Sequence, residues 1–75
     1  MSKAEFLDEL SEIVELPPGS LQGGEKLADL EGWTSMAMMS FIALADEKFD
    51  KQISPRAFIN CETVDDLGKL VGLSG

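Results

Sequence analysis

Apolar residues recur every three or four positions in the first part of the chain, and acidic residues lie between them. Between positions 3 and 15 the apolar positions are Phe6, Leu7, Leu10, Ile13 and Val14. This spacing is typical of an amphipathic helix. Ser2 can cap its start, with Glu5 three residues later as in a capping box, and Pro17 stops it. The pattern therefore predicts a first helix over about residues 3–15.

The most apolar stretch of the chain, residues 36–49, predicts a second helix over about residues 34–49. Its expected core-facing stripe consists of Met38, Phe41, Ile42, Ala45 and Phe49. Met36, Met39 and Ala43 extend the apolar surface beyond that stripe. Between the two helices, residues 20–33 form a long connection in which Leu21, Leu27 and Leu30 are expected to anchor to the core.

Two shorter helices are predicted in the last third of the chain. Pro55 suits the first turn of a short third helix over about residues 56–60, which should direct Phe58 and Ile59 into the packing. Thr63 supplies an N-cap and Asp66 an acidic third position, an Asp variant of the capping box, ahead of a last helix over about residues 64–71.

No strand-like alternation competes with these helices. The fold class that we predict is all-α: a small four-helix bundle, with three main helices and a short third one, and a long loop between the first two. With 75 residues, the chain is near the lower limit for a single hydrophobic core, so we expect residues 1–75 to form one domain.

Charge and composition remove several classes of function. Fourteen acidic and six basic residues give a net charge of −8, which disfavours nucleic acid and anionic membrane surfaces and favours basic protein partners. One cysteine and no histidine argue against an internal disulfide and a metal site of the usual ligands. Without a signal-like start or an apolar run that could span a bilayer, we expect a cytoplasmic protein with no membrane insertion.

Ser35 is the residue with the clearest functional potential. It lies in Gly32-Trp33-Thr34-Ser35-Met36, where a glycine-containing loop gives way to the apolar second helix. A serine there has its hydroxyl outward and can carry a group on that oxygen. The competing interpretation is that Ser35 only caps the helix. Because the chain lacks histidine, the usual Ser-His arrangement of a nucleophilic serine is absent, and an enzyme is disfavoured.

From Leu27 to Val71 the chain resembles the acyl carrier proteins and related phosphopantetheine-binding carrier domains. The residues that carry the resemblance are Gly32-Trp33-Thr34-Ser35-Met36, then Phe49 with Ile53, then Thr63-Val64 with Leu67. In the family these positions hold a Gly-(Ala or Trp)-Asp-Ser-Leu stretch, a helix that ends in Phe-Gly or Phe-Asp, an Ile after a short turn, and a Thr-Val helix start. The three landmarks fall into register without a gap.

The resemblance implies that 4′-phosphopantetheine from coenzyme A is attached to Ser35. The chain would then be a monomeric carrier, not an enzyme, that holds acyl or related intermediates as thioesters in a specialised fatty acid, lipid or polyketide pathway. Its implied partners are a phosphopantetheinyl transferase and acyl-transfer, synthase or ligase enzymes with basic docking patches. An acyl chain is expected between the second and third helices, near Ala43, Ile53, Phe58 and Ile59.

Two departures from the family pattern lie beside Ser35. Thr34 replaces the usual Asp, which preserves the cap but removes a negative charge, and Met36 replaces the usual Leu at similar volume. The exposed face of the second helix carries Asp46 and Glu47 only near its end. We therefore predict partner recognition through Thr34, Met36, Met39, Asp46 and Glu47, with less charge and more apolar contact than in many carriers.

Two alternatives remain at the level of the sequence. The chain could carry amino acids, as in peptide synthesis or cell-wall alanylation. It could also be an unmodified helical interaction module that uses the methionine-rich second helix as a docking face.

Overall fold

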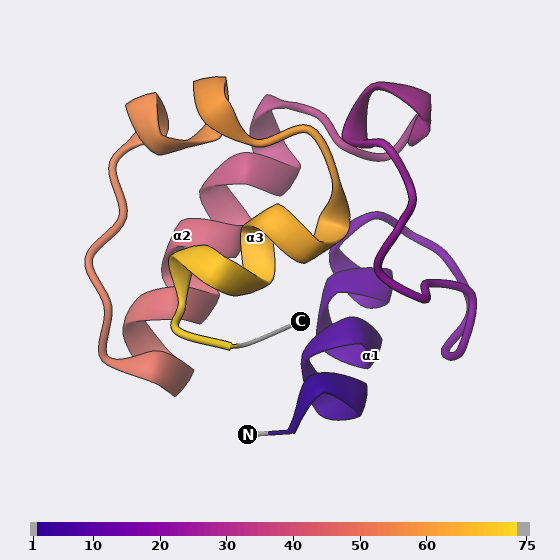
Figure 1. Ribbon diagram of the computed structural model, residues 1–75, viewed down its shortest axis with the longest axis horizontal. Coiled ribbons are helices and arrows are strands. Elements are labelled where there is room, and N and C mark those ends of the chain that lie inside the picture. Colours follow the sequence, from indigo (N-terminus) through magenta and orange to yellow (C-terminus); the bar gives the residue numbers. More distant parts are fainter. Residues whose placement is uncertain (1, 74–75) are drawn as a thin grey trace.

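Three α-helices and two short 3₁₀ helices make up the computed structural model, which describes residues 2–73. The order is α1 (Lys3–Ile13), η1 (Leu27–Asp29), α2 (Ser35–Phe49), η2 (Pro55–Asn60) and α3 (Val64–Leu70). The N-terminal end of α2 lies at the top of Figure 1, between η1 and η2. The fold is all-helical, as predicted, and the described residues contain no strand, only an isolated bridge between Lys26 and Thr63.

Local capping chemistry sets most of the helix starts. The Ser2 hydroxyl accepts the Glu5 N–H at 3.2 Å and Thr34 accepts that of Ala37 at 3.2 Å. Thr63 and Asp66 form the predicted capping box. The first helix ends at Ile13 rather than near residue 15, because Glu15 adopts a left-handed conformation with φ 60°. The sequence pattern did not predict η1, a single turn within the long connection.

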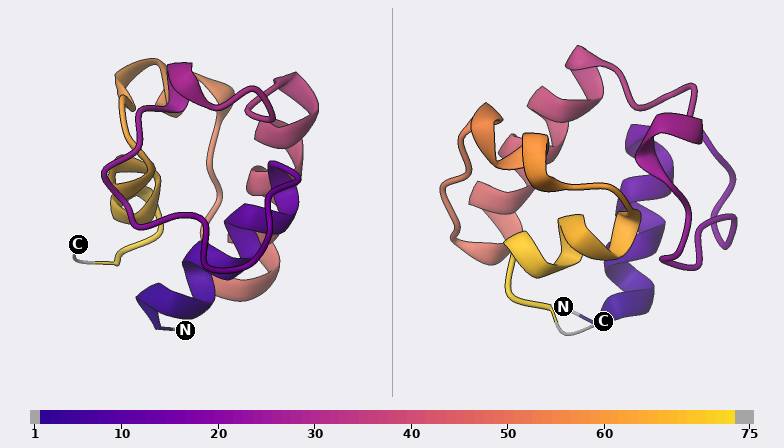
Figure 2. Two further views of the ribbon diagram at one scale, coloured as in Figure 1. Left: turned by 90° about the vertical axis from the view of Figure 1, so that its right-hand side faces the viewer. Right: turned by 45° about the horizontal axis from the view of Figure 1, so that its top comes forward.

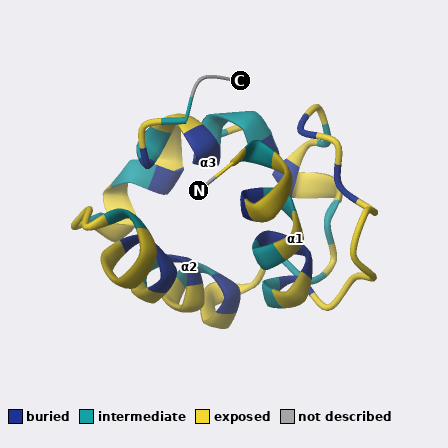
Figure 3. Cartoon of the chain, turned by 90° about the horizontal axis from the view of Figure 1, so that it is seen from below, coloured by how far each residue is buried: buried dark blue, intermediate teal, exposed yellow. Residues whose placement is uncertain are grey.

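The buried faces of α1, α2 and α3 turn toward one another, as Figure 3 shows. On α2 the fully buried residues of the predicted stripe are Phe41 and Ala45, while Met38, Ile42 and Phe49 pack partly buried against the core. Ala37 and Leu44 are also buried, which was not predicted. Leu21 and Leu27 are buried and Leu30 is partly buried, so the predicted anchors of the long connection are confirmed.

The short helix η2 shows that one prediction was wrong. Phe58 is buried at 8% exposure, but Ile59 is 80% exposed and does not pack into the core. The helix η2 is 3₁₀, in which side chains three positions apart align on one face. Phe58 and the partly buried Cys61 therefore share the inward face, and Ile59 is rotated away from it.

The long connection is tied to the segment that leads into α3. Figure 2 shows this connection, in purple, crossing from α1 to the top of the molecule. The N–H groups of Val64 and Asp65 donate to the carbonyl oxygens of Glu25 and Gly23, at 3.0 and 2.8 Å. The pKa of the Glu25 carboxyl is lowered overall. Burial alone would raise this pKa, but hydrogen bonds from the backbone N–H groups of Gly23, Gln22 and Glu25 itself have the larger, opposite effect. This carboxylate thus stabilises the bend.

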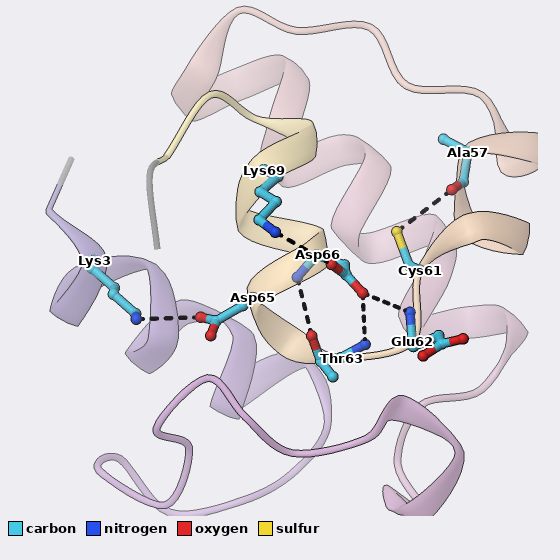
Figure 4. A network of polar contacts seen from close by, with 8 residues as sticks. All are labelled: Lys3, Ala57, Cys61, Glu62, Thr63, Asp65, Asp66 and Lys69. Carbon is cyan, nitrogen blue, oxygen red and sulfur yellow. Dashed lines mark hydrogen bonds and ion pairs between the residues drawn. The ribbon is translucent and has the colours of Figure 1, made fainter.

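A polar network fixes the start of α3 (Figure 4). The carboxylate of Asp66 accepts the N–H groups of Glu62 at 2.9 Å and Thr63 at 3.1 Å. These bonds lower the pKa of the Asp66 carboxyl, and Lys69 nearby adds to the effect. Next to this network, burial raises the pKa of the Cys61 thiol and Asp66 raises it further, so the thiol is held in its unreactive protonated form.

Gly32 permits a close approach between the end of α1 and the segment that precedes α2. A Cβ atom at Gly32 would overlap the carbonyl oxygen of Val14 and come within 2.9 Å of the Val14 Cα. Because the obstacle is backbone, it cannot move aside as a flexible side chain would. Gly24 lies in the same connection, and a Cβ there would meet nothing within 4 Å.

We predict that acid destabilises the protein partly through Asp66. Because its pKa is lowered in the folded state, the stabilisation is fully present above the unfolded value of about 3.9 and is lost as the pH falls through the folded pKa. Asp66→Asn should therefore flatten the fall in melting temperature below about pH 4, measured by circular dichroism. Glu47→Gln, at an exposed position on α2, is the control. An equally steep fall in Asp66→Asn and the parent would contradict this role.

We also predict that Gly32→Ala lowers the free energy of unfolding by roughly 1–3 kcal/mol, because the methyl group forces the backbone near Val14 to shift. Gly24→Ala is the matched control and should change it by less than about 0.5 kcal/mol. Urea titration monitored by circular dichroism measures both. Equal stability of the two variants would show that the close approach is not a constraint in solution.

Candidate functional site

Ser35 is the first residue of α2 and its side chain is exposed. Thr34 caps the helix, with its Oγ1 accepting the Ala37 N–H and its carbonyl accepting the Met38 N–H at 2.9 Å. Within residues 2–73, no group hydrogen bonds to the Ser35 hydroxyl. The capping role that competed for Ser35 therefore belongs to Thr34, and the Ser35 oxygen is left available.

The helix end next to Ser35 favours a negatively charged group. The N–H groups of Ser35 and Met36 have no acceptor within the described part of the chain, because they precede the first intrahelical bond. Such N–H groups and the helix dipole stabilise anions, and the first turn of α2 contains no acidic residue that would oppose this. A phosphodiester on the Ser35 oxygen would lie in this field.

Trp33 holds the segment before Ser35 against the core. Its ring contacts Phe41 of α2 and Phe58 of η2 edge to face, with centroid distances of 6.3 and 5.5 Å. Aromatic pairs of this kind contribute about 0.5–1.5 kcal/mol each beyond the area they bury. Ser35 therefore follows a segment with a fixed position, not a free loop.

The residues predicted for partner recognition are all exposed on α2 or at its cap. Met36 is 79% exposed and Met39 is 69% exposed, on the half of the helix that begins at Ser35. Asp46 and Glu47 are exposed near the other end. The structure thus brings Thr34, Met36 and Met39 to the same end of α2 as Ser35 and leaves the two acidic residues remote from it.

The four residues predicted for an acyl pocket are divided between surface and core. Ala43 and Ile59 are exposed, Ile53 is partly buried, and Phe58 is buried against Trp33 and Phe41. None of them lines the two surface hollows near Ser35, which lie between α1, the long connection and α2. The acyl pocket stays a prediction.

The two hollows were not predicted from the sequence. The smaller, of about 350 Å³, is bordered by Thr34 and Met36 on the two sides of Ser35 and by Glu12 and Glu31. The larger, of about 550 Å³, continues along the connection past Leu30. Nothing in the sequence pattern shows that residues 12–15 lie next to residues 31–40, since this depends on how α1 packs on α2.

A metal site and a membrane-spanning helix were also sought among the described residues. Among residues 2–73 there is no group of three or more His, Cys, Asp or Glu side chains that could hold a metal ion. No helix in that range has the length and apolarity needed to cross a membrane.

A comparison with protein-family models matches residues 4–71 to the family described as the phosphopantetheine attachment site. Comparisons with curated proteins and with solved structures find no match. Domains of the matched family carry a covalently attached 4′-phosphopantetheine group and are not themselves catalytic. Since the match extends over nearly the whole length, the chain belongs to the phosphopantetheine-binding carrier domains.

Proposed function

We propose that Ser35 is the residue that carries the 4′-phosphopantetheine arm, and that the protein holds acyl intermediates on it. The thiol of the bound arm supplies the thioester linkage. The observation that carries the proposal is the free, exposed hydroxyl of Ser35 at the start of a 15-residue helix, within the segment that the family match covers.

The residues around Ser35 fit a phosphodiester. Thr34 occupies the capping position, so the Ser35 oxygen can lose its proton and bond to phosphorus without breaking a hydrogen bond that holds the helix. As this bond forms, the pyrophosphate bond of coenzyme A breaks and adenosine 3′,5′-bisphosphate leaves. The N–H groups of Ser35 and Met36 lie at the helix end, where they can donate hydrogen bonds to the phosphate oxygens. Because α2 spans 15 residues, its dipole is fully developed at this end.

Ser40 is the best internal comparison for Ser35. It is also an exposed serine on α2, but it lies in the second turn, where the backbone N–H groups are engaged in the helix. A group attached there would lack the free N–H groups of the helix end. Exposure alone therefore does not distinguish the two serines, whereas the helix end does.

The finer assignment is an acyl carrier of a specialised fatty acid, lipid or polyketide pathway. The surface beside Ser35 supports it, because the partner-facing half of α2 has two exposed methionines and no acidic residue in its first turn. Methionine side chains adapt to irregular partner surfaces. Partner enzymes that take the arm from this carrier would thus meet a more apolar α2 than the acidic composition of the chain suggests.

We predict that incubating the protein with coenzyme A and broad-specificity phosphopantetheinyl transferases adds one phosphopantetheinyl group. Intact-mass spectrometry should show the addition in the parent and in Ser40→Ala, and peptide mapping should place it on Ser35. Ser35→Ala should show no addition, because the unengaged serine hydroxyl at the helix end is gone and the other hydroxyl there, that of Thr34, is engaged in the cap.

The two serine variants should have the same melting temperature, which excludes misfolding as the cause of lost modification. Modification that persists in Ser35→Ala would assign the arm to another residue. A parent protein that stays unmodified with every transferase, and that is also bare when isolated from its own cells, would refute the proposal.

A further inference from the structure

The charges around Ser35 are distributed unevenly, with acidic residues on the α1 side and a basic residue on the η2 side. On the α1 side, the smaller hollow is lined by Glu12, Glu15 and Glu31, and the larger hollow adds Asp29. Neither lining contains a lysine or an arginine. On the other side of the α2 start, η2 has a single charged residue, the exposed Arg56, next to the exposed Ile59.

Acidic residues on α2 itself are too far away to dominate this field. Asp46 is eleven positions after Ser35, which is about 16 Å along a helix. The Debye length at physiological ionic strength is about 8 Å, so exposed charges at that separation are largely screened. The acids that a partner meets at Ser35 are therefore those that α1 and the long connection contribute.

The same hollow has an apolar wall on α2. Met36 and Ala37 line it beside the carboxylates, and Met36 is 79% exposed. An apolar wall with an acidic rim on one side matches a protein surface that presents an apolar side chain flanked by lysine or arginine. Nucleic acid and anionic lipid headgroups would be repelled by the same rim.

We propose that the phosphopantetheinyl transferase that modifies Ser35 docks over the hollow between α1 and α2, with basic side chains against Glu12 and Glu31 and an apolar side chain against Met36. This inference rests on the proposed function. It differs from the expectation that Asp46 and Glu47 supply the acidic contacts. It also fixes the direction of approach, because a basic flank turned toward η2 would face Arg56.

The test is the rate of modification of Glu12→Gln/Glu31→Gln by a transferase that modifies the parent, with coenzyme A in excess. Both residues are exposed, and Glu15 is left unchanged because its backbone has φ 60°. We expect kcat/KM to fall roughly three- to tenfold at low salt, as for the loss of two exposed charge pairs. The difference from the parent should shrink as sodium chloride is raised, because salt screens exposed charges.

Two controls remove the same number of charges elsewhere. Asp8→Asn/Glu9→Gln changes α1 one turn before Glu12, at residues that do not line the hollow. Asp46→Asn/Glu47→Gln changes the far end of α2. Both should keep kcat/KM within about twofold of the parent if contact at the hollow is what matters. Thermal melts of all variants establish that they are folded.

The outcomes separate the inference from the function on which it rests. Modification of Glu12→Gln/Glu31→Gln at the parent rate would overturn the docking site and leave Ser35 as the attachment residue. An equal loss in all three double variants would also overturn it, since only net charge would then matter. Failure to modify the parent with any transferase would refute the proposed function and the inference together.

Discussion

Phe41 is the side chain on which the arrangement around Ser35 depends. It is fully buried in the middle of α2 and contacts Phe6 of α1, Trp33 and Phe58 of η2 edge to face, with centroids 5.8 to 6.3 Å apart. All five aromatic residues of the chain belong to this network, since Phe49 contacts Phe6. One ring thus joins α2 to α1, to the segment before Ser35 and to η2.

In a small domain, a few core residues must both stabilise the fold and position the site. With 75 residues there is room for one core, and long charged or polar side chains contribute little to it. Trp33 and Gly32 act together on the segment before α2: the ring packs inward, and the missing side chain at Gly32 lets the backbone approach Val14. The hydroxyl of Ser35 is thereby presented on a rigid element, so an arm attached there, as proposed, would itself have to supply the reach to a partner.

The features that could be predicted from the sequence depend on residues close to one another along the chain. The caps Thr34 and Thr63 were predictable because a side-chain oxygen needs only a backbone N–H three residues later. Ile59 was predicted wrongly because the inward direction in η2 depends on its 3₁₀ geometry, which the sequence pattern did not reveal. Ala37 and Leu44 were missed because burial on α2 is set by where α1 and α3 pack, not by hydrophobicity alone.

The charge asymmetry at Ser35 has the same origin in tertiary packing. In the sequence, Glu12, Glu15 and Glu31 are ordinary surface acids on two separate segments. Packing the end of α1 against the start of α2 brings them to one hollow, while Lys3 and Lys26, the nearest bases in sequence, line neither hollow. A charge pattern assembled this way can be altered on α1 without touching α2, so the proposed docking surface and the helix proposed to bear the arm can vary independently.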